Sequence, residues 1–516
     1  MGAALREASM RIIIRRFGRS LTLPIVALLF ALSAASLYGQ ATDPSTRYGQ
    51  EIVIRGGLMF DGVSDTRVRN TGIVIRNGKF FEVHADLAGR DLSQARVIAL
   101  SDDVTILPGM FDLHAHHNMA LAGAGRVDEF TYNPIIWLAN GVTSTWPAGE
   151  YNPEGMMEAR KRIDSGKQIG ARIFNSGPYF GAARCQGVNS YRIGCKDWPK
   201  DISEQKIRDE VDYWAEQGVR SLKIKLASPE QMRIIIDQAH KHGLTASSHL
   251  HTEDFHQEVD PRDAIQMGLD RIEHSIAPVE DVMRGRFPVG SPELNAIIRM
   301  MLSRNVYYDA TMRVYGAAIL AKVPGLQTTW TDESRFFTPY TRSLIAKRAA
   351  SGVVDGAPQF QPAGSLRNFP LLFHHKVPEL KAFYEAGGAR LITVGTDAPT
   401  SGPNLGGFDY HRELQALVYA GIPPVAVLKA ATMNGARALG VSDSFGSIEV
   451  GKWADLYVAA GNPLEHIEDA RNVRMVMKAG QIYDPSALLE SVEGKIGPSS
   501  PGDVSAWSAP RIAPSH

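Results

Sequence analysis

Short blocks of apolar residues, separated by turn signals, fill residues 50–107. Gly56-Gly57 and Asn77-Gly78 are typical of tight turns between strands. The apolar blocks lie at 52–54, 72–76, 79–83, 97–100 and 104–107. None of them has the three-to-four-residue spacing of a helix. This part of the chain therefore predicts a β-domain.

Beyond Pro108 the pattern changes to strands that alternate with helices. One helix is predicted over 201–216, and another begins at Ser228 with a capping box to Gln231 and ends at Gly243. Strand-like runs lie at 110–113, 141–146, 171–176, 221–225, 244–248, 270–273, 306–310 and 391–394. Strands alternating with helices indicate a parallel sheet, and eight of them predict a (β/α)8 TIM barrel of the α/β class.

Two stretches do not fit a simple barrel. Residues 313–375 are rich in proline, glycine and aromatics, so we expect a lid-like insertion. Strand patterns return at 455–458 and 473–477. The proline- and serine-rich end, 491–516, is expected to be a disordered tail.

Overall composition is ordinary for a globular protein, with 44% hydrophobic residues, 21% charged residues and a formal net charge of +0. That balance gives no electrostatic case for a nucleic-acid partner. Near the N-terminus, arginines precede a short apolar run at 21–32 and then small residues, which predicts a signal peptide over 1–41. The run is too short for a comfortable membrane span, so we expect an exported protein, periplasmic or secreted.

Candidate metal ligands follow several of the strands. His114 and His116 are two residues apart at the end of the first barrel strand, so both side chains point to one side. Alone, such a pair is weak evidence. Lys223, His249, His274 and Asp397 also stand at the ends of apolar runs. A parallel barrel collects its strand ends at one face, which makes a shared site the better interpretation.

Four of these residues, His114, His116, His274 and Asp397, lie within motifs that resemble the metal-dependent amidohydrolase superfamily, in its imidazolonepropionase-related, Xaa-Pro dipeptidase-like branch. The motifs are 107–116, 268–275, 395–398, 430–440 and 446–456, and the resemblance covers about 50–485. It implies a small β-sandwich built from 50–107 and 441–490 around a barrel over 108–440. In combination these motifs are specific, although none is specific alone.

The resemblance implies two divalent metal ions, with zinc favoured although manganese, cobalt or nickel suit the same ligands. His114, His116 and Asp397 would hold one ion, and His249 and His274 the other. A carboxylated Lys223 would bridge them; Lys223 fits the family register better than Lys225 does. Asp397 would be the general base in cleavage of an amide bond.

His251 would polarise the carbonyl or contact the substrate, at a place where related dipeptidases have tyrosine. The expected substrate is a small amide: a dipeptide, an Xaa-Pro peptide or an N-acyl amino acid. A cyclic-amide hydrolase or a deaminase is an alternative, although deaminases of this superfamily usually lack the strand-four lysine. A non-catalytic, metal-free binding protein of the same fold is a further alternative. Whether the protein forms a homo-oligomer stays open.

The two cysteines, Cys185 and Cys195, are close in sequence. In an exported protein such a pair predicts a disulfide, here after the third strand. Two free buried thiols are the alternative.

Overall fold

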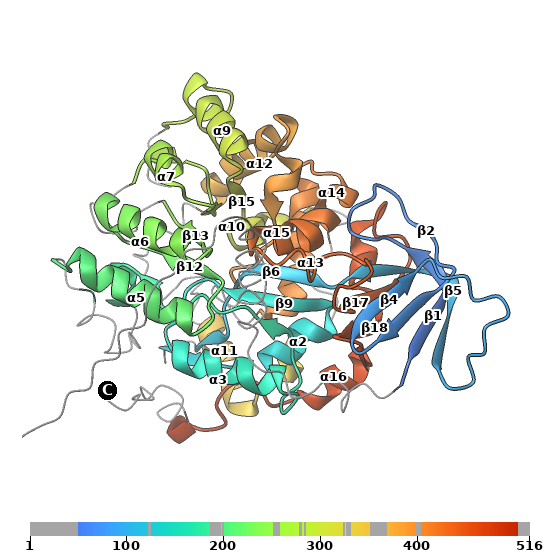
Figure 1. Ribbon diagram of the computed structural model, residues 1–516. Coiled ribbons are helices and arrows are strands. Elements are labelled where there is room, and N and C mark those ends of the chain that lie inside the picture. The colour runs from blue at the N-terminus through green and yellow to red at the C-terminus, as the bar shows by residue number, and fades with distance from the viewer. Residues whose placement is uncertain are drawn as a thin grey trace, which may run out of the picture. The chain divides into compact units, whose positions relative to one another are not determined.

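The computed structural model describes residues 50–121, 125–185, 198, 201–250, 259–277, 281–282, 285–323, 326, 332–350, 369–398 and 404–503 (Figure 1). The predicted signal peptide, 1–41, lies outside these residues. No helix in the described ranges is both long and apolar enough to cross a bilayer.

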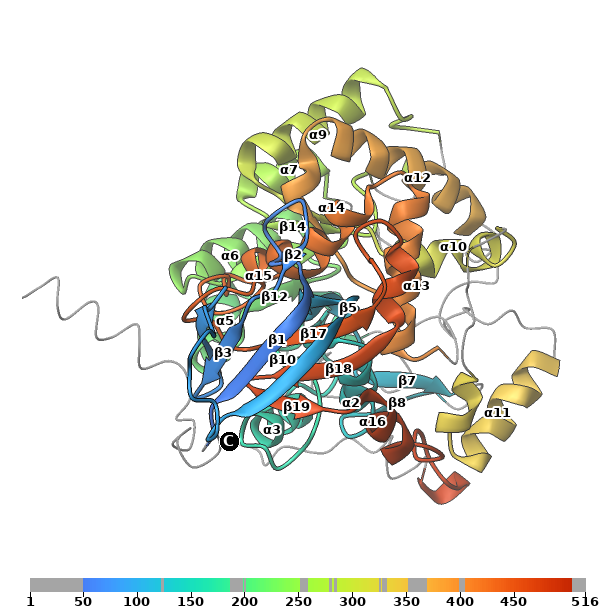
Figure 2. The ribbon, with the colours of Figure 1, turned by 90° about the vertical axis from the view of Figure 1, so that its right-hand side faces the viewer.

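One mixed sheet of eight strands joins the two ends of the described chain. Its order is β19-β18-β17-β5-β1-β3-β4, with β2 paired to β1. The strands are β1 (Ile52–Met59), β2 (Val68–Arg69), β3 (Ile73–Arg76), β4 (Lys79–Val83), β5 (Arg96–Pro108), β17 (Leu456–Ala460), β18 (Val473–Lys478) and β19 (Gln481–Tyr483). Figure 2 shows β17 and β18 beside β1 and β5. The structure places both terminal segments in this sheet, while the second layer of a sandwich stays a prediction.

Two parallel sheets hold the predicted barrel strands. The first has the order β10-β9-β6 and the second β11-β12-β13-β14-β15-β16. Their strands are β6 (Met110–Ala115), β9 (Val142–Pro147), β10 (Arg172–Ile173), β11 (Tyr179–Phe180), β12 (Ser221–Ile224), β13 (Thr245–Ser248), β14 (Arg271–Glu273), β15 (Tyr307–Asp309) and β16 (Ile392–Thr393). The predicted third strand is only two residues long here, and β11 follows it as a separate element.

Single parallel bridges connect the two sheets at both edges. Ala115 pairs with Ala398, and Glu150 pairs with Pro178. This arrangement is similar to a TIM barrel, but the described strands form two sheets rather than one closed barrel. The complete (β/α)8 closure therefore stays a prediction.

Helices follow the parallel strands, as the sequence pattern predicts. The capping box at Ser228 is present, because its hydroxyl accepts from the Gln231 amide and the Gln231 side chain accepts from the Ser228 amide. The α-helices outside the insertion are α2 (Asn133–Ala139), α3 (Pro153–Asp164), α5 (Glu204–Glu216), α6 (Pro229–Lys241), α7 (Pro261–Met267), α9 (Pro292–Arg304), α13 (Gly406–Tyr419), α14 (Pro424–Lys429), α15 (Gly435–Ala438) and α16 (Pro485–Ser491). A short hairpin, β7 (Asn118–Leu121) and β8 (Gly125–Asp128), and the turns η2 (Ala182–Cys185), η5 (Gly388–Leu391), η6 (Ala430–Asn434) and η7 (Ile467–Arg471) complete them.

The predicted insertion is largely helical where it is described. It holds α10 (Met312–Leu320), η3 (Glu333–Phe336) and α11 (Pro339–Ala350), and α12 (Phe369–Glu385) runs out of it. Two of its aromatics, Phe336 and Phe337, are buried in a cluster that also contains Val492 and Ile496. The expected tail is therefore packed as far as Ile496, and any disordered part begins later. The lid role of the insertion stays a prediction.

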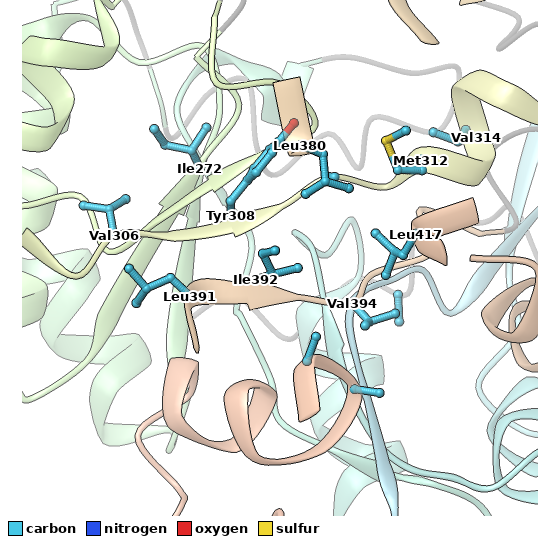
Figure 3. Close-up of a cluster of buried hydrophobic side chains, with 14 of the residues drawn as sticks. Ile272, Val306, Tyr308, Met312, Val314, Leu380, Leu391, Ile392, Val394 and Leu417 are labelled. Carbon is cyan, nitrogen blue, oxygen red and sulfur yellow. The ribbon is translucent and has the colours of Figure 1, made fainter. Parts of the chain in front are cut away.

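Helix α12 is anchored on the ends of the parallel strands. Figure 3 shows Tyr308 of β15 directed toward the segment of α12 that carries Leu380, with Ile392 of β16 beside it. The Tyr308 hydroxyl donates to Glu379 Oε1 on α12 at 2.6 Å and lies 3.1 Å from the His274 carbonyl. This contact fixes an insertion helix next to a predicted metal ligand.

Candidate metal centre

Five of the six predicted ligands form two overlapping clusters at the strand ends. Ligand atoms of His114, His249 and His274 lie within 4.8 Å of one another, and so do those of His114, His116 and Asp397. These residues are more than 280 positions apart at the extremes, and only the parallel sheet topology brings them together.

Backbone hydrogen bonds between β6 and the segment after β16 fix the first cluster. The Asp397 amide donates to the His114 carbonyl at 2.7 Å, and the His116 amide donates to the Ala398 carbonyl at 3.0 Å. Gly395 allows this close approach, because a Cβ there would lie 2.4 Å from the His114 Cβ. Any side chain at position 395 would therefore push β6 away from the segment that carries Asp397.

Two of the predicted ligands have a left-handed backbone. His274 has φ +69° and Asp397 has φ +52°. Non-glycine residues in this region typically cost about 1–2 kcal/mol, and histidine and aspartate are among those that adopt it most readily. The turn at His274 ends the alternation of β14, which explains how adjacent Glu273 and His274 both contact the cluster.

Two imidazoles of the cluster face each other through their Nε2 atoms. His249 Nε2 and His274 Nε2 are 2.5 Å apart, and His274 Nδ1 is 2.7 Å from Thr311 Oγ1. A hydroxyl on Nδ1 fixes the ring and leaves Nε2 to face a cation, which is the usual support of a ligating histidine. Neither ring nitrogen of buried His114 makes a well-aligned hydrogen bond among the described residues, although carboxylate oxygens of Glu273 and Asp397 lie 3.2 and 3.5 Å from them. This set of nitrogen and carboxylate donors fits a divalent transition metal.

Burial also keeps His114 in the protonation state that a ligand needs. Desolvation, followed by the charge of Lys223, lowers the pKa of His114 well below its usual value. A neutral imidazole has the lone pair that binds a metal.

Lys223 is completely buried and lies against Glu273, a residue to which the sequence analysis gave no role. Lys223 Nζ pairs with Glu273 Oε2, and the same oxygen is 3.2 Å from His114 Nδ1. Burial is the main cause that lowers the pKa of Lys223 well below its usual value. Glu273 directly precedes His274 in the family motif, and that adjacency was the only sequence signal for it.

Asp112 on β6 is hydrogen-bonded to Thr396, the residue that precedes Asp397. Its carboxylate accepts from Trp137 Nε1 at 3.0 Å and from the amide and hydroxyl of Thr396 at 3.1 and 2.8 Å. Burial raises the pKa of Asp112 to about 7 in spite of these donors. The Thr396 side chain thereby fixes the backbone that leads into Asp397.

Two other sequence predictions cannot be placed. His251 and Cys195 lie outside the described residues. The role of His251 and the Cys185–Cys195 disulfide therefore stay predictions.

Glu150, which the sequence analysis did not single out, is a buried carboxyl just beyond β9. Its Oε1 accepts from Asn175 Nδ2 and from the Ser176 amide, both at 3.1 Å, while Oε2 has no hydrogen-bond partner in the described structure. Burial raises the pKa of Glu150 to about 8 from an ordinary 4.5. The folded protein therefore holds this proton more tightly than the unfolded chain does.

We expect Glu150→Gln to flatten the pH dependence of stability. Between about pH 4.5 and 8 the unfolded chain releases the Glu150 proton while the folded protein retains it, so the free energy of unfolding falls as pH rises. Denaturant midpoints of both proteins across this range measure the difference. Glu158→Gln on exposed α3 serves as the control, and parallel wild-type and Glu150→Gln curves would contradict the assignment.

Comparisons with known proteins show the family and the fold of this chain. The sequence profile of the amidohydrolase family matches residues 105–483. A crystal structure of a Xaa-Pro dipeptidase with methionine bound in its active site is 22% identical and superposes with a TM-score of 0.61, over 84% of this chain and 100% of that one. Molinate hydrolase shares the fold, with 21% sequence identity and a TM-score of 0.61 over 88% of this chain and 99% of that one. The ochratoxinase of A. niger also shares it, with 17% identity and a TM-score of 0.58 over 86% of this chain and 99% of that one. No curated protein matches by sequence.

Proposed function

Because this chain belongs to the amidohydrolase family and is a hydrolase of carbon–nitrogen bonds, we propose that it cleaves a small amide at a divalent metal centre. The proposed ligands are His114, His116, His249, His274 and Asp397, with a carboxylated Lys223 between two ions, zinc being favoured. The observation that carries the proposal is the convergence of the histidine and aspartate donor atoms, within 4.8 Å of one another in each of two clusters that share His114. A bound cation there would supply Lewis acidity, which lowers the pKa of water and polarises the amide carbonyl.

Asp397 is positioned to move the protons. Its Oδ1 lies 2.9 Å from His116 Nε2 and 3.5 Å from His114 Nε2, and its side chain keeps 13% exposure while His114 keeps 1%. We assign it to take a proton from the attacking water and deliver it to the departing amine nitrogen. The carbon–nitrogen bond breaks as that nitrogen is protonated, and the water oxygen stays on the acyl carbon.

The environment of Lys223 supports its proposed carboxylation. Carbon dioxide reacts with a neutral amine, and burial lowers the pKa of this lysine, which increases its neutral fraction. The neutral amine would form a carbon–nitrogen bond to carbon dioxide and lose one proton, which converts a neutral group into an anion among the histidines. Lys225 is only partly buried and its ammonium lies 5.8 Å from the centre of the Tyr179 ring.

We propose a dipeptide of the Xaa-Pro type or an N-acyl amino acid as the substrate. Support comes from structural neighbours that include a Xaa-Pro dipeptidase and a prolidase complexed with N-methylphosphonate-L-proline. We also propose export, on the strength of the signal-like residues 1–41.

Metal analysis and a substrate panel test this function together. The purified full chain should contain two metal ions, lose hydrolysis after treatment with a chelator and regain it with zinc. The panel holds alanyl-proline, N-acetyl-methionine and a lactam, with cytosine for deamination. Turnover of the lactam or cytosine alone would replace the dipeptidase proposal with the cyclic-amide or deaminase alternative. A protein without metal or turnover would be a binding member of the family.

A further inference from the structure

A buried lysine near the candidate metal centre has no hydrogen-bond partner among the described residues. Lys376 on α12 is 1% exposed, and its Nζ makes no hydrogen bond among the described residues. It lies 4.6 Å from the centre of the Tyr315 ring on α10. That ring is in turn 5.8 Å from the ring of His274, so Lys376 stands one aromatic side chain away from a proposed ligand.

Two of the four acidic groups whose charges act on Lys376 are already bonded elsewhere. Glu379, on its own helix, accepts from Tyr308 at 2.6 Å and from the Ile276 amide at 3.1 Å, and His375 lies 3.3 Å away. Glu413 on α13 accepts from the Met312 and Arg313 amides at 2.8 and 2.6 Å. Lys376 is therefore not needed to satisfy either of them.

The charge of Lys376 also reaches the centre itself. Burial lowers its pKa to about 8, and the charges of Glu379, Glu413, Asp309 and Asp397 oppose that shift. Asp397 is the proposed base, so the charge of Lys376 interacts electrostatically with that of the base. An ammonium carries three donor hydrogens, and leaving them unmet in the interior is costly.

We propose that Lys376 binds a carboxylate of the substrate and so makes the enzyme select amides that carry a free carboxylate, as dipeptides and N-acyl amino acids do. This inference rests on the proposed function and narrows it. A carboxylate supplies the acceptors that the ammonium lacks, and a charge-assisted hydrogen bond is stronger in a buried site than in water. A neutral amide of the same shape offers a weaker acceptor and a competing donor.

The test compares each acid with its carboxamide. The probes are N-acetyl-methionine with N-acetyl-methioninamide, followed by acetate release, and alanyl-proline with alanyl-prolinamide, followed by alanine release. The proteins are the zinc-loaded wild type, Lys376→Met and Lys376→Gln. Lys381→Met is the matched control, because Lys381 lies on the same helix but its side chain is 55% exposed.

We expect the wild type to prefer the acid by about 10- to 100-fold in kcat/KM, mostly through KM. Both Lys376 variants should lose this preference and keep carboxamide turnover, while Lys381→Met keeps it. A purely structural role would lower both rates together and leave the ratio unchanged. An unchanged ratio in the variants, or no preference in the wild type, would overturn the inference and leave amide hydrolysis standing.

If the wild type cleaves none of the probes, it is the proposed function that fails. Calorimetry then decides the inference. Binding of N-acetyl-methionine that is lost in Lys376→Met supports it, and equal binding or no binding to both proteins overturns it.

Discussion

Asp397→Asn should lower kcat by about 10²–10⁴-fold, because asparagine keeps the shape of the side chain but cannot accept the proton of the attacking water. Asparagine also tolerates a left-handed backbone, so the φ of +52° at this position should survive the change. The protein should therefore fold, and its histidines should still bind metal. Steady-state kinetics, metal content and the midpoint of thermal unfolding measure the three consequences separately.

The matched control for this substitution is Asp443→Asn, at an exposed loop position outside the centre. It should leave kcat within about twofold, because surface changes away from a site rarely matter. Near-wild-type turnover by Asp397→Asn would remove Asp397 from the proton transfer. A loss of all metal together with turnover would instead make Asp397 mainly a ligand.

The strand-end ligands could be predicted because their signals are local and regular. His114 and His116 follow an apolar run, and His274 and Asp397 each close another, so topology alone predicts convergence. The capping box at Ser228 is equally local, and the structure contains it as predicted. Patterns of this kind survive folding because the backbone geometry that they specify does not depend on distant residues.

What the sequence could not show depends on tertiary contacts. Lys376 and Glu379 lie on α12 among ordinary apolar residues, and nothing in their spacing indicates that the helix lies over the strand ends. Glu273 lies on a strand beside His274, and alternation would place the two on opposite faces. Only the left-handed turn at His274, with φ +69°, lets both of them reach the cluster.

The helices of the insertion were missed for a related reason. Its glycine, proline and aromatic content is typical of irregular structure, yet α10 and α12 form because each packs against the other and the rest of the domain. Tertiary burial overrides weak helix propensity in such segments. The aromatics Phe336 and Phe337 pack in a separate cluster with Phe408, Val492 and Ile496 and do not by themselves indicate a lid.

The largest effect on the centre is expected from Lys223→Ala. Removal of the proposed bridge should lower metal affinity by more than the 10–100-fold that is typical for the loss of an outer partner of a ligand. Hydrolysis should fall with the metal content, and the carbamate carbon should disappear from the ¹³C NMR spectrum of protein equilibrated with ¹³C-bicarbonate. Loss of the lysine also removes one basic partner of buried Glu273, whose Oε1 still lies 3.2 Å from Arg271, so some destabilisation should accompany the change.

Lys225→Ala is the control that separates loss of the proposed Lys223 bridge from the general effect of removing a lysine from this strand end. Lys225 is two residues further along, was the alternative in the sequence and is only partly buried beside Tyr179. We expect this variant to keep both metals and the carbamate resonance, since the Lys225 side chain lies beside Tyr179 and is only partly buried. A resonance that persists in Lys223→Ala and vanishes in Lys225→Ala would transfer the bridge to Lys225. Its absence from the wild type, in protein with full metal content, would show that an uncarboxylated lysine and the histidines suffice to bind the ions.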